Sequence, residues 1–137
     1  MTKIKPVGYK LSPTEYEIHV SFVDYVNKRY PDFAVDLIHI PNEGKRTIAG
    51  GVRQKRLGLK AGVPDLFFAR PAKNPLGVTL YSGLWIEFKT EKGRVSKEQE
   101  VFILRASQHG YLAIVCRNIE HAINIFDYYV GYLDKKG

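Results

Sequence analysis

Three charged residues of this sequence, Asp65, Glu87 and Lys89, have types and a spacing that could do chemistry together. Glu87 and Lys89 lie two residues apart at the end of an apolar run, Leu84-Trp85-Ile86. Because side chains alternate between the two faces of a strand, a strand over residues 84–89 places both charged groups on the same face. Burying a carboxylate and an ammonium is costly, so their presence at the end of such a strand indicates a function.

Asp65 follows Pro64 directly and opens a second apolar run over residues 66–69. If the two strands pair, Asp65 lies beside Glu87, and neighbouring carboxylates repel each other unless a hard cation such as Mg²⁺ neutralises them. Oxygen-ligand metal sites that keep bound water are suited to phosphodiester hydrolysis. The alternative is a structural ion pair between Glu87 and Lys89 on an edge strand. The same Glu-x-Lys spacing recurs at residues 43–45, but within a turn.

The positive charge of the protein is concentrated in one segment. The chain has 21 Lys and Arg residues against 14 Asp and Glu residues, a net charge of +7. Residues 44–64 contain no acidic residue and hold most of the excess, at Lys45, Arg46, Arg53, Lys55, Arg56 and Lys60. A concentrated positive field favours a polyanionic partner, nucleic acid first and an anionic membrane second. A solvated basic face that serves solubility is the alternative.

The elements that position these residues can be predicted from capping and periodicity. Ser12, Pro13 and Glu15 indicate a helix start, with Ser12 as N-cap and Glu15 closing a capping box, and the helix should run to about Lys28. Alternating apolar residues predict a strand over 33–40, before a turn at 41–44. We further expect a short helix within 50–60, a strand over 66–69, a loop over 70–77 and a long strand over 78–89.

The second half of the chain has clearer signals. Ser96 and Gln99 form a capping-box pattern for a helix that ends near His109, with Gly110 following it. A buried strand is expected over 112–116, and Asn118 should cap a last helix that reaches Val130. This order of elements predicts an α/β domain with a mixed sheet and helices on both faces.

Length and composition agree with one such domain. The 137 residues are 45% hydrophobic, enough for a core, and no apolar run approaches the ~18–20 residues that span a bilayer. The single cysteine, Cys116, excludes an intramolecular disulfide and a cysteine-based zinc site. The first residues carry no apolar segment typical of a signal peptide, so we expect an intracellular protein without membrane association.

An ordered series of motifs resembles the VRR-NUC family, a branch of the PD-(D/E)xK nucleases. The segments that carry the resemblance are GVPDL at 62–66, GLWIEFKT at 83–90 and GRVSKEQ at 93–99, with IPNEG at 40–44, Arg46, Gly110-Tyr111 and a glutamate in the first helix. The resemblance covers residues 12–130, within a single domain over 1–137. It implies a restriction-endonuclease-like α/β fold and a Mg²⁺- or Mn²⁺-dependent endodeoxyribonuclease.

The resemblance also implies roles for individual residues. Asp65 and Glu87 match the metal-binding carboxylates, and the Phe88 position commonly gives a backbone carbonyl to the metal. Lys89 matches the lysine that orients or polarises the attacking water, and Gln99 the motif glutamine. The helix glutamate, a further metal ligand, is assigned to Glu15, with Glu17 as the alternative. Where many relatives have glutamine four residues later, this chain has His19, as a polar supporting residue or a metal ligand.

The stand-alone members that this chain resembles are associated with phages and prophages and are similar to Holliday junction resolvases. The resemblance therefore implies a homodimer that cuts branched DNA, a four-way junction above all, in the cytoplasm of a bacterial host. We expect the basic segment to contact the phosphate backbone near the metal site. A monomeric flap or general DNA endonuclease is one alternative, and a catalytically silent DNA-binding module is another.

Overall fold

The computed structural model describes residues 12–41 and 48–133. A four-stranded sheet contains β1 (Leu37–His39), β2 (Leu66–Phe68), β5 (Leu84–Phe88) and β6 (Leu112–Cys116), in the order β1-β2-β5-β6. Strand β2 is antiparallel to both of its neighbours, β1 and β5, while β5 and β6 are parallel. The sheet is therefore mixed, as the order of elements predicted.

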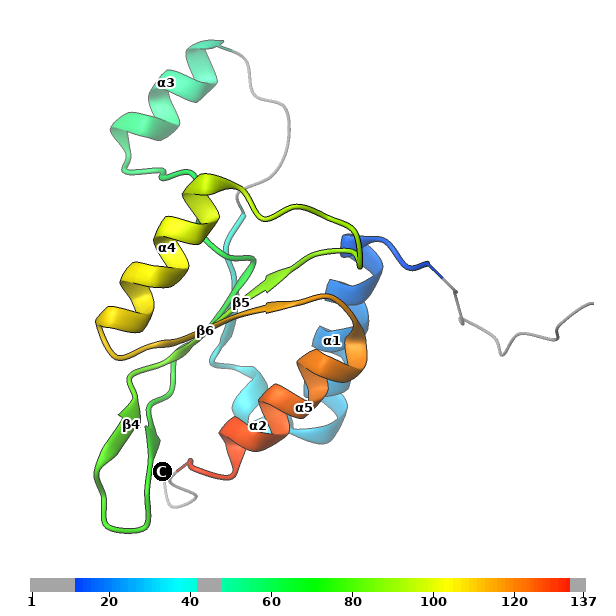
Figure 1. Ribbon diagram of the computed structural model, residues 1–137, viewed down its shortest axis with the longest axis vertical. Coiled ribbons are helices and arrows are strands. Elements are labelled where there is room, and N and C mark those ends of the chain that lie inside the picture. The colour runs from blue at the N-terminus through cyan, green and yellow to red at the C-terminus, as the bar shows by residue number, and fades with distance from the viewer. Residues whose placement is uncertain (1–11, 42–47, 134–137) are drawn as a thin grey trace, which may run out of the picture.

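Helices cover both faces of this sheet (Figure 1). On one face lie α1 (Glu15–Arg29), the short α2 (Pro31–Ala34) and α5 (Ile119–Val130). On the other face, α4 (Lys97–Gln108) packs against β6. The layers confirm the predicted α/β class with helices on both faces.

The main core lies between the sheet and the α1–α5 layer. Phe22 of α1 contacts Phe88 of β5 and Phe126 of α5, with ring centroids 5.7 and 5.6 Å apart respectively. Phe68 of β2 reaches the same Phe126 ring at 4.9 Å, and all four rings are fully buried. Each such buried side chain contributes about 1.5–3 kcal/mol of hydrophobic stabilisation. This packing holds α1 and α5 against the sheet beneath the carboxyl end of β5.

Strand β1 is shorter than predicted. The expected strand over 33–40 is wrong in its first half, because Phe33 and Ala34 belong to α2. Pro31 occupies the first position of α2, where its fixed φ angle favours a helical turn and its missing N–H costs nothing. The alternation of apolar residues over 33–40 therefore corresponds to a strand only at Leu37–His39.

The long strand predicted over 78–89 is also wrong, because the chain breaks at Ser82-Gly83 into β4 (Thr79–Tyr81) and β5. A Cβ at Gly83 would lie 2.8 Å from the Phe67 ring, so a larger residue here would require that ring to shift. Strand β4 instead pairs with β3 (Ala72–Lys73), inside the segment expected to be a loop. The two form a separate hairpin that projects from the sheet (Figure 1).

The predicted cap of the first helix is wrong by two residues. Thr14 is the N-cap, and Glu17 closes the capping box in place of Glu15. The other capping predictions are confirmed: Ser96 and Gln99 cap α4, Gly110 follows it with a φ of +88°, and Asn118 caps α5. The short helix expected within the basic segment is α3 (Ile48–Arg56). Over the described residues, no helix is long and apolar enough to span a membrane.

Candidate active site

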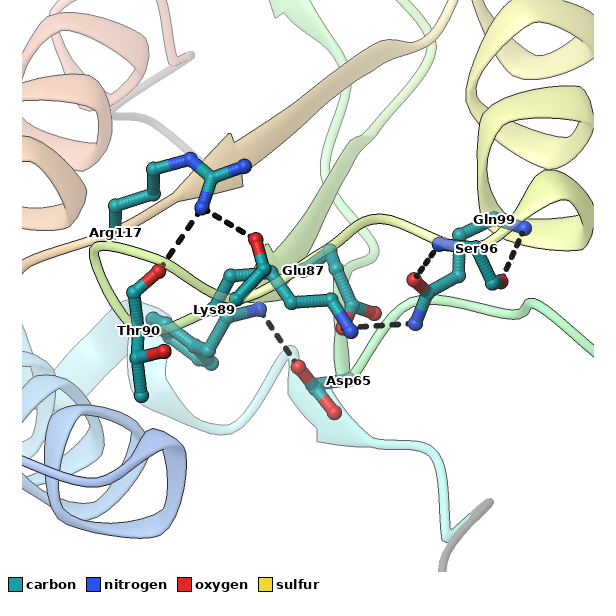
Figure 2. Close-up of polar contacts among 9 residues, drawn as sticks. Asp65, Glu87, Lys89, Thr90, Ser96, Gln99 and Arg117 are labelled. Carbon is teal, nitrogen blue, oxygen red and sulfur yellow. Dashed lines mark hydrogen bonds and ion pairs between the residues drawn. The ribbon is translucent and has the colours of Figure 1, made fainter.

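The pairing of β2 with β5 brings Asp65 and Glu87 together. Leu66 lies opposite Ile86 in the antiparallel register, so the preceding Asp65 falls opposite Glu87. The Asp65 carboxylate also accepts a hydrogen bond from the backbone N–H of Phe88, with 2.7 Å between N and Oδ2. Figure 2 shows Asp65, Glu87 and Lys89 gathered at the carboxyl end of β5. The geometry that the sequence predicted for these carboxylates is present.

Glu87 is the buried carboxylate of the pair, with 3% of its surface exposed. Its Oε2 atom lies 3.8 Å from Nζ of Lys89 and accepts a hydrogen bond from Nε2 of Gln99 at 3.1 Å. Burial, followed by the negative charge of Asp65, raises the pKa of Glu87 to about 8, although Lys89 acts in the opposite direction. The positive charge of Lys89 therefore does not fully offset the free-energy cost of burying the Glu87 carboxylate beside Asp65.

Gln99 links this carboxylate to the first turn of α4. Its Oε1 accepts from the backbone N–H of Ser96 at 2.8 Å, and its own backbone N–H donates to the Ser96 hydroxyl at 3.1 Å. The capping box therefore fixes the side-chain amide, and Nε2 points at Glu87 (Figure 2). The side chain of Gln99 therefore both caps α4 and donates a hydrogen bond to Glu87, a candidate metal ligand.

The segment that leads to Asp65 packs directly on α4. Gly62 has a φ of +84°, and a Cβ there would lie 2.4 Å from the backbone carbon of Glu98 and 2.7 Å from the backbone nitrogen of Gln99. Only glycine combines this left-handed conformation with such a close approach. Gly62 therefore sets the distance between the residues before Asp65 and the helix that holds Gln99.

A cavity of about 240 Å³ opens beside the two carboxylates. It is lined by Glu15, Tyr16, His19, Val63, Asp65, Glu87, Lys89 and Gln99. Glu15 lines the cavity, whereas the Glu17 carboxylate accepts hydrogen bonds from the backbone N–H and hydroxyl of Thr14 at 3.2 and 2.9 Å. Of the two glutamates left open by the sequence, the structure places Glu15 at the site. The Thr-x-x-Glu spacing of residues 14–17 was the signal for this cap.

His39 lies next to Asp65, and His19 lies next to His39. Nδ1 of His39 is 3.0 Å from the Asp65 backbone oxygen, which also accepts from the N–H of Ile40 at 2.9 Å. The His19 ring lies edge-on to the His39 ring, with centroids 5.0 Å apart. Nothing in the sequence indicated His39, because its place depends on the pairing of β1 with β2.

Arg117 holds the loop that follows Lys89. Its Nη1 atom donates to the backbone oxygens of Gly93, Thr90 and Glu91 at 2.7, 2.9 and 3.3 Å. Figure 2 shows Arg117 beside Thr90. The Lys89 N–H in turn donates to the Cys116 carbonyl at 3.0 Å, so β5 and β6 stay joined at this end. Sequence reasoning missed Arg117, because no motif surrounds it and its partners are backbone groups.

The basic segment is only partly described. Arg53, Lys55 and Arg56 lie in the last turn of α3 and are exposed, as is Lys60. Lys45 and Arg46 lie outside the described residues. Helix α3 extends beyond the sheet, at the end of the molecule where α4 begins (Figure 1). None of the described basic side chains of this segment lines the cavity, so the structure does not bring them into the site itself.

The donor atoms fit a hard divalent cation that keeps water ligands. Among residues 12–41 and 48–133, no three His, Cys, Asp or Glu side chains converge into a ready-made metal cluster. Asp65 and Glu87 are already adjacent, and after burial the negative charge of Asp65 contributes to the raised pKa of Glu87, so a cation beside both would offset their repulsion. Mg²⁺ usually binds through one or two carboxylates and retains several waters, which matches a pair of carboxylates beside a cavity of about 240 Å³.

The sequence matches the VRR-NUC domain over residues 10–118. The chain belongs to the VRR-NUC domain family. Its fold is also similar to a solved structure described as "VRR_NUC domain protein", with a TM-score of 0.74. The two sequences are 24% identical, and the match covers 90% of this chain and 93% of that chain. A comparison with curated proteins gives no match.

Membership in the VRR-NUC family confirms the resemblance found in the sequence and the restriction-endonuclease-like fold. It gives the protein a nuclease-type, DNA-processing function. The solved neighbour contributes the fold alone.

Proposed function

We propose that this VRR-NUC protein is a Mg²⁺- or Mn²⁺-dependent endonuclease that hydrolyses phosphodiester bonds in branched DNA. We further propose that it resolves four-way junctions as a homodimer. The observation that carries the proposal is the pair of carboxylates, Asp65 and Glu87, placed side by side with Lys89 next to a cavity. Family membership supports the nuclease activity, and the charges support DNA as the substrate.

The metal would be held by oxygen atoms from three elements. Asp65 and Glu87 supply the main carboxylates, the Phe88 carbonyl belongs to the same strand end, and Glu15 lies on the α1 wall of the cavity. When bound, a divalent cation supplies an acidified water and stabilises the charge that develops on the phosphoryl group.

The chain's own groups have separate tasks in this proposal. Lys89 stands beside Glu87 and can hold the attacking water or neutralise a phosphate oxygen. Gln99 keeps Glu87 in place through the capping box. The basic residues of α3, together with Lys60, Lys45 and Arg46, would follow the DNA backbone by charge and shape rather than by reading base edges.

Cleavage of synthetic substrates tests the proposal directly. The purified protein is incubated with a four-way junction, a flap and a linear duplex, in Mg²⁺, Mn²⁺ or EDTA. Symmetric nicks confined to the junction, absent in EDTA, are the expected result. Cleavage of the flap alone would replace junction resolution with flap removal, and binding without cleavage of any substrate would overturn the enzyme assignment.

The oligomeric state needs its own measurement. Light scattering after size exclusion should give twice the mass of one chain for the protein alone, and that mass plus the mass of the DNA for the complex with the junction. A monomer that cuts one strand of the junction would contradict the homodimer and favour the general endonuclease.

A further inference from the structure

We propose that Tyr16 forms a base-stacking subsite at the mouth of the cavity, where its ring covers the face of an unstacked nucleobase next to the phosphate that is cut. The inference rests on the proposed function and deepens it, because such a contact distinguishes branched DNA from continuous duplex. The ligand of this subsite is a nucleobase with a free face, whatever its sequence.

Tyr16 lies on the α1 wall of the cavity that contains the candidate metal ligands. It is the second residue of α1 and lines the cavity together with Asp65 and Glu87. Its side chain is nevertheless 76% exposed, so most of the ring surface faces solvent rather than protein. A side chain that lines the cavity and remains this exposed lies at its mouth.

Exposed aromatic rings are uncommon in this protein. Of the Phe, Tyr and Trp residues within 12–41 and 48–133, only Tyr16 and Tyr128 are exposed. Tyr128 is 49% exposed and lies beside Tyr132 at the end of α5, with ring centroids 5.3 Å apart. Tyr16 therefore offers the larger exposed aromatic surface, and it offers that surface next to the candidate metal site.

The first turn of α1 holds the backbone of Tyr16 in place. The capping box joins Thr14 and Glu17 on either side of it, with the Glu17 N–H donating to the Thr14 hydroxyl at 3.1 Å. Ile18 is 2% exposed and anchors the same turn in the core. A tyrosine in a helix has few rotamers, and its two side-chain torsions cost little entropy to order. The ring is thus presented at a low entropic cost of binding.

The chemistry of the cavity divides a nucleotide between two contacts. The phosphate belongs with the cation that Asp65 and Glu87 are proposed to hold, since the carboxylates alone repel an anion. The Tyr16 ring is uncharged and aromatic, so it suits the neutral aromatic base of an adjoining nucleotide. Because every phosphate is flanked by two nucleosides, a phosphate inside the cavity brings a base to its mouth.

The proposed backbone contacts lie on the other side of the site. Helix α3, with its exposed basic residues, lies beyond the start of α4, whereas Tyr16 belongs to α1, which covers the opposite face of the sheet from α4 (Figure 1). The cavity is lined from both helices, by Gln99 of α4 and by Tyr16. DNA that contacts α3 and enters the cavity therefore continues toward Tyr16.

Stacking on Tyr16 requires a base with an uncovered face. In a continuous duplex the neighbouring bases cover both faces, so the ring could stack only on a base that is first pulled out of the helix, which costs free energy. At a branch point or a flap the stack is already interrupted, and this cost is smaller. The contact therefore favours interrupted DNA without reading its sequence, because every base has an aromatic face.

Substitutions at the two exposed tyrosines test the stacking contact. Tyr16→Ala removes the ring, Tyr16→Phe removes only the hydroxyl, and Tyr128→Ala is the matched control on α5. Affinities for a four-way junction and for a linear duplex of equal length are measured by fluorescence anisotropy in EDTA. The urea midpoint of Tyr16→Ala should not fall, because the side chain is exposed and alanine favours a helix.

Tyr16→Ala should bind the junction about tenfold more weakly, the size typical of one lost base stack, and should bind the duplex within about threefold of the unmodified protein. Tyr16→Phe and Tyr128→Ala should stay within about threefold on both DNAs. An equal loss on junction and duplex, or no loss on either, would overturn the proposal. A loss in Tyr16→Phe as large as in Tyr16→Ala would assign the contact to the hydroxyl and overturn stacking.

Removal of a base from the DNA identifies the partner of the ring. An abasic analogue is placed in turn at each nucleotide around the branch point, and the anisotropy measurement is repeated with the unmodified protein and Tyr16→Ala. At one position, the missing base should weaken binding of the unmodified protein by the same factor as Tyr16→Ala does. The two changes together should weaken binding no further. Additive losses at every position would contradict the stacking contact.

The affinity measurements do not require cleavage. If the unmodified protein cleaves no DNA, the proposed nuclease function fails, while the comparison of ring and base removal still decides whether Tyr16 stacks on a base. If the unmodified protein binds no DNA, both proposals are overturned. Where cleavage in Mn²⁺ is observed, Tyr16→Ala should lower kcat/KM for the junction by about the same tenfold, and an unchanged kcat/KM would contradict a contact next to the phosphate that is cut.

Discussion

Gln99 of α4 donates a hydrogen bond to Glu87 of β5, while the other end of its amide accepts from the backbone of Ser96. One side chain thus completes a helix cap and contacts the buried carboxylate of the site (Figure 2). The two tasks are normally separate, since a capping-box glutamine needs only its acceptor oxygen. The start of α4 and the candidate metal ligand are therefore coupled through a single amide group.

Gln99→Ala should reduce cleavage much more than it reduces stability. It removes the cap and the donor to Glu87 together, and the loss of the cap is worth about 1 kcal/mol in the free energy of unfolding. Ser96→Ala is the matched control, because it breaks the same cap and leaves the amide available to Glu87. We expect cleavage by Gln99→Ala to be at least about tenfold slower than by Ser96→Ala, at similar urea midpoints. Equal rates would contradict the positioning role of Gln99.

Gly62→Ala should lower the free energy of unfolding by more than the left-handed backbone conformation of residue 62 alone explains. A left-handed alanine costs about 1–2 kcal/mol, and the overlap with the backbone of Glu98 and Gln99 adds about 1–3 kcal/mol. Gly58→Ala is the control, since Gly58 has a φ of +101° but no atom within 4 Å of an added Cβ. The free energies of unfolding by urea should therefore differ between the two variants. If both variants lost the same free energy of unfolding, the close approach of Gly62 to α4 would not contribute to stability.

The parts of the fold that follow from local chemistry could be predicted from the sequence. The caps at Ser96 and Asn118 and the strand over 112–116 are set by residues within a few positions of one another, and all agree with the structure. The pairing of Asp65 with Glu87 could also be predicted, because Asp65 directly precedes one predicted strand and Glu87 lies near the end of the strand that pairs with it.

Features that depend on distant contacts could not be predicted from the sequence. The break between β4 and β5 accompanies the pairing of β4 with β3 in a separate hairpin, which no local pattern indicates. The cap of α1 is a local feature that was missed for another reason, since Ser12 with Glu15 and Thr14 with Glu17 offer the same pattern. His39 and Arg117 reach the site through strand pairing and backbone contacts, which leave no motif in the sequence.

Lys89→Ala should abolish cleavage and leave DNA binding nearly intact. The Lys89 Nζ lies 3.8 Å from Oε2 of Glu87, and the lysine is proposed to act on the attacking water or the phosphate. Most of the affinity for DNA is proposed to come from the basic segment instead. Single-turnover cleavage in Mn²⁺ and anisotropy in EDTA measure the two properties separately. Lys92→Ala, an exposed lysine in the next turn, should change neither. Cleavage retained by Lys89→Ala would leave the lysine as a charge-balancing partner of Glu87.

The exposed basic residues in the last turn of α3 should affect how strongly DNA affinity depends on salt concentration. Replacing Arg53, Lys55 and Arg56 by alanine removes positive charges that are proposed to neutralise DNA phosphates. The slope of log affinity against log salt concentration should then become shallower by up to about 0.9 for each phosphate that is no longer neutralised. Cleavage at saturating DNA should change little, because none of these side chains lines the cavity.

A triple variant with the same change in net charge serves as the control for α3. Lys28, Arg29 and Lys73 are exposed and lie outside the basic segment. Their replacement by alanine should leave the salt slope nearly unchanged. Equal slopes for the two triple variants would show that the overall charge of the protein, and not α3, governs its affinity for DNA.

Arg117→Ala should loosen the loop that joins Lys89 to α4. The three carbonyl oxygens of Thr90, Glu91 and Gly93 lose a shared charged donor, which should lower the free energy of unfolding by about 2–3 kcal/mol. Because the loop continues directly from Lys89, kcat should fall while DNA affinity in EDTA is kept. Arg94→Ala, an exposed arginine in the same loop, should stay within about 0.5 kcal/mol of the unmodified protein. If Arg117→Ala lowered stability but kept kcat, the loop would not determine the position of Lys89.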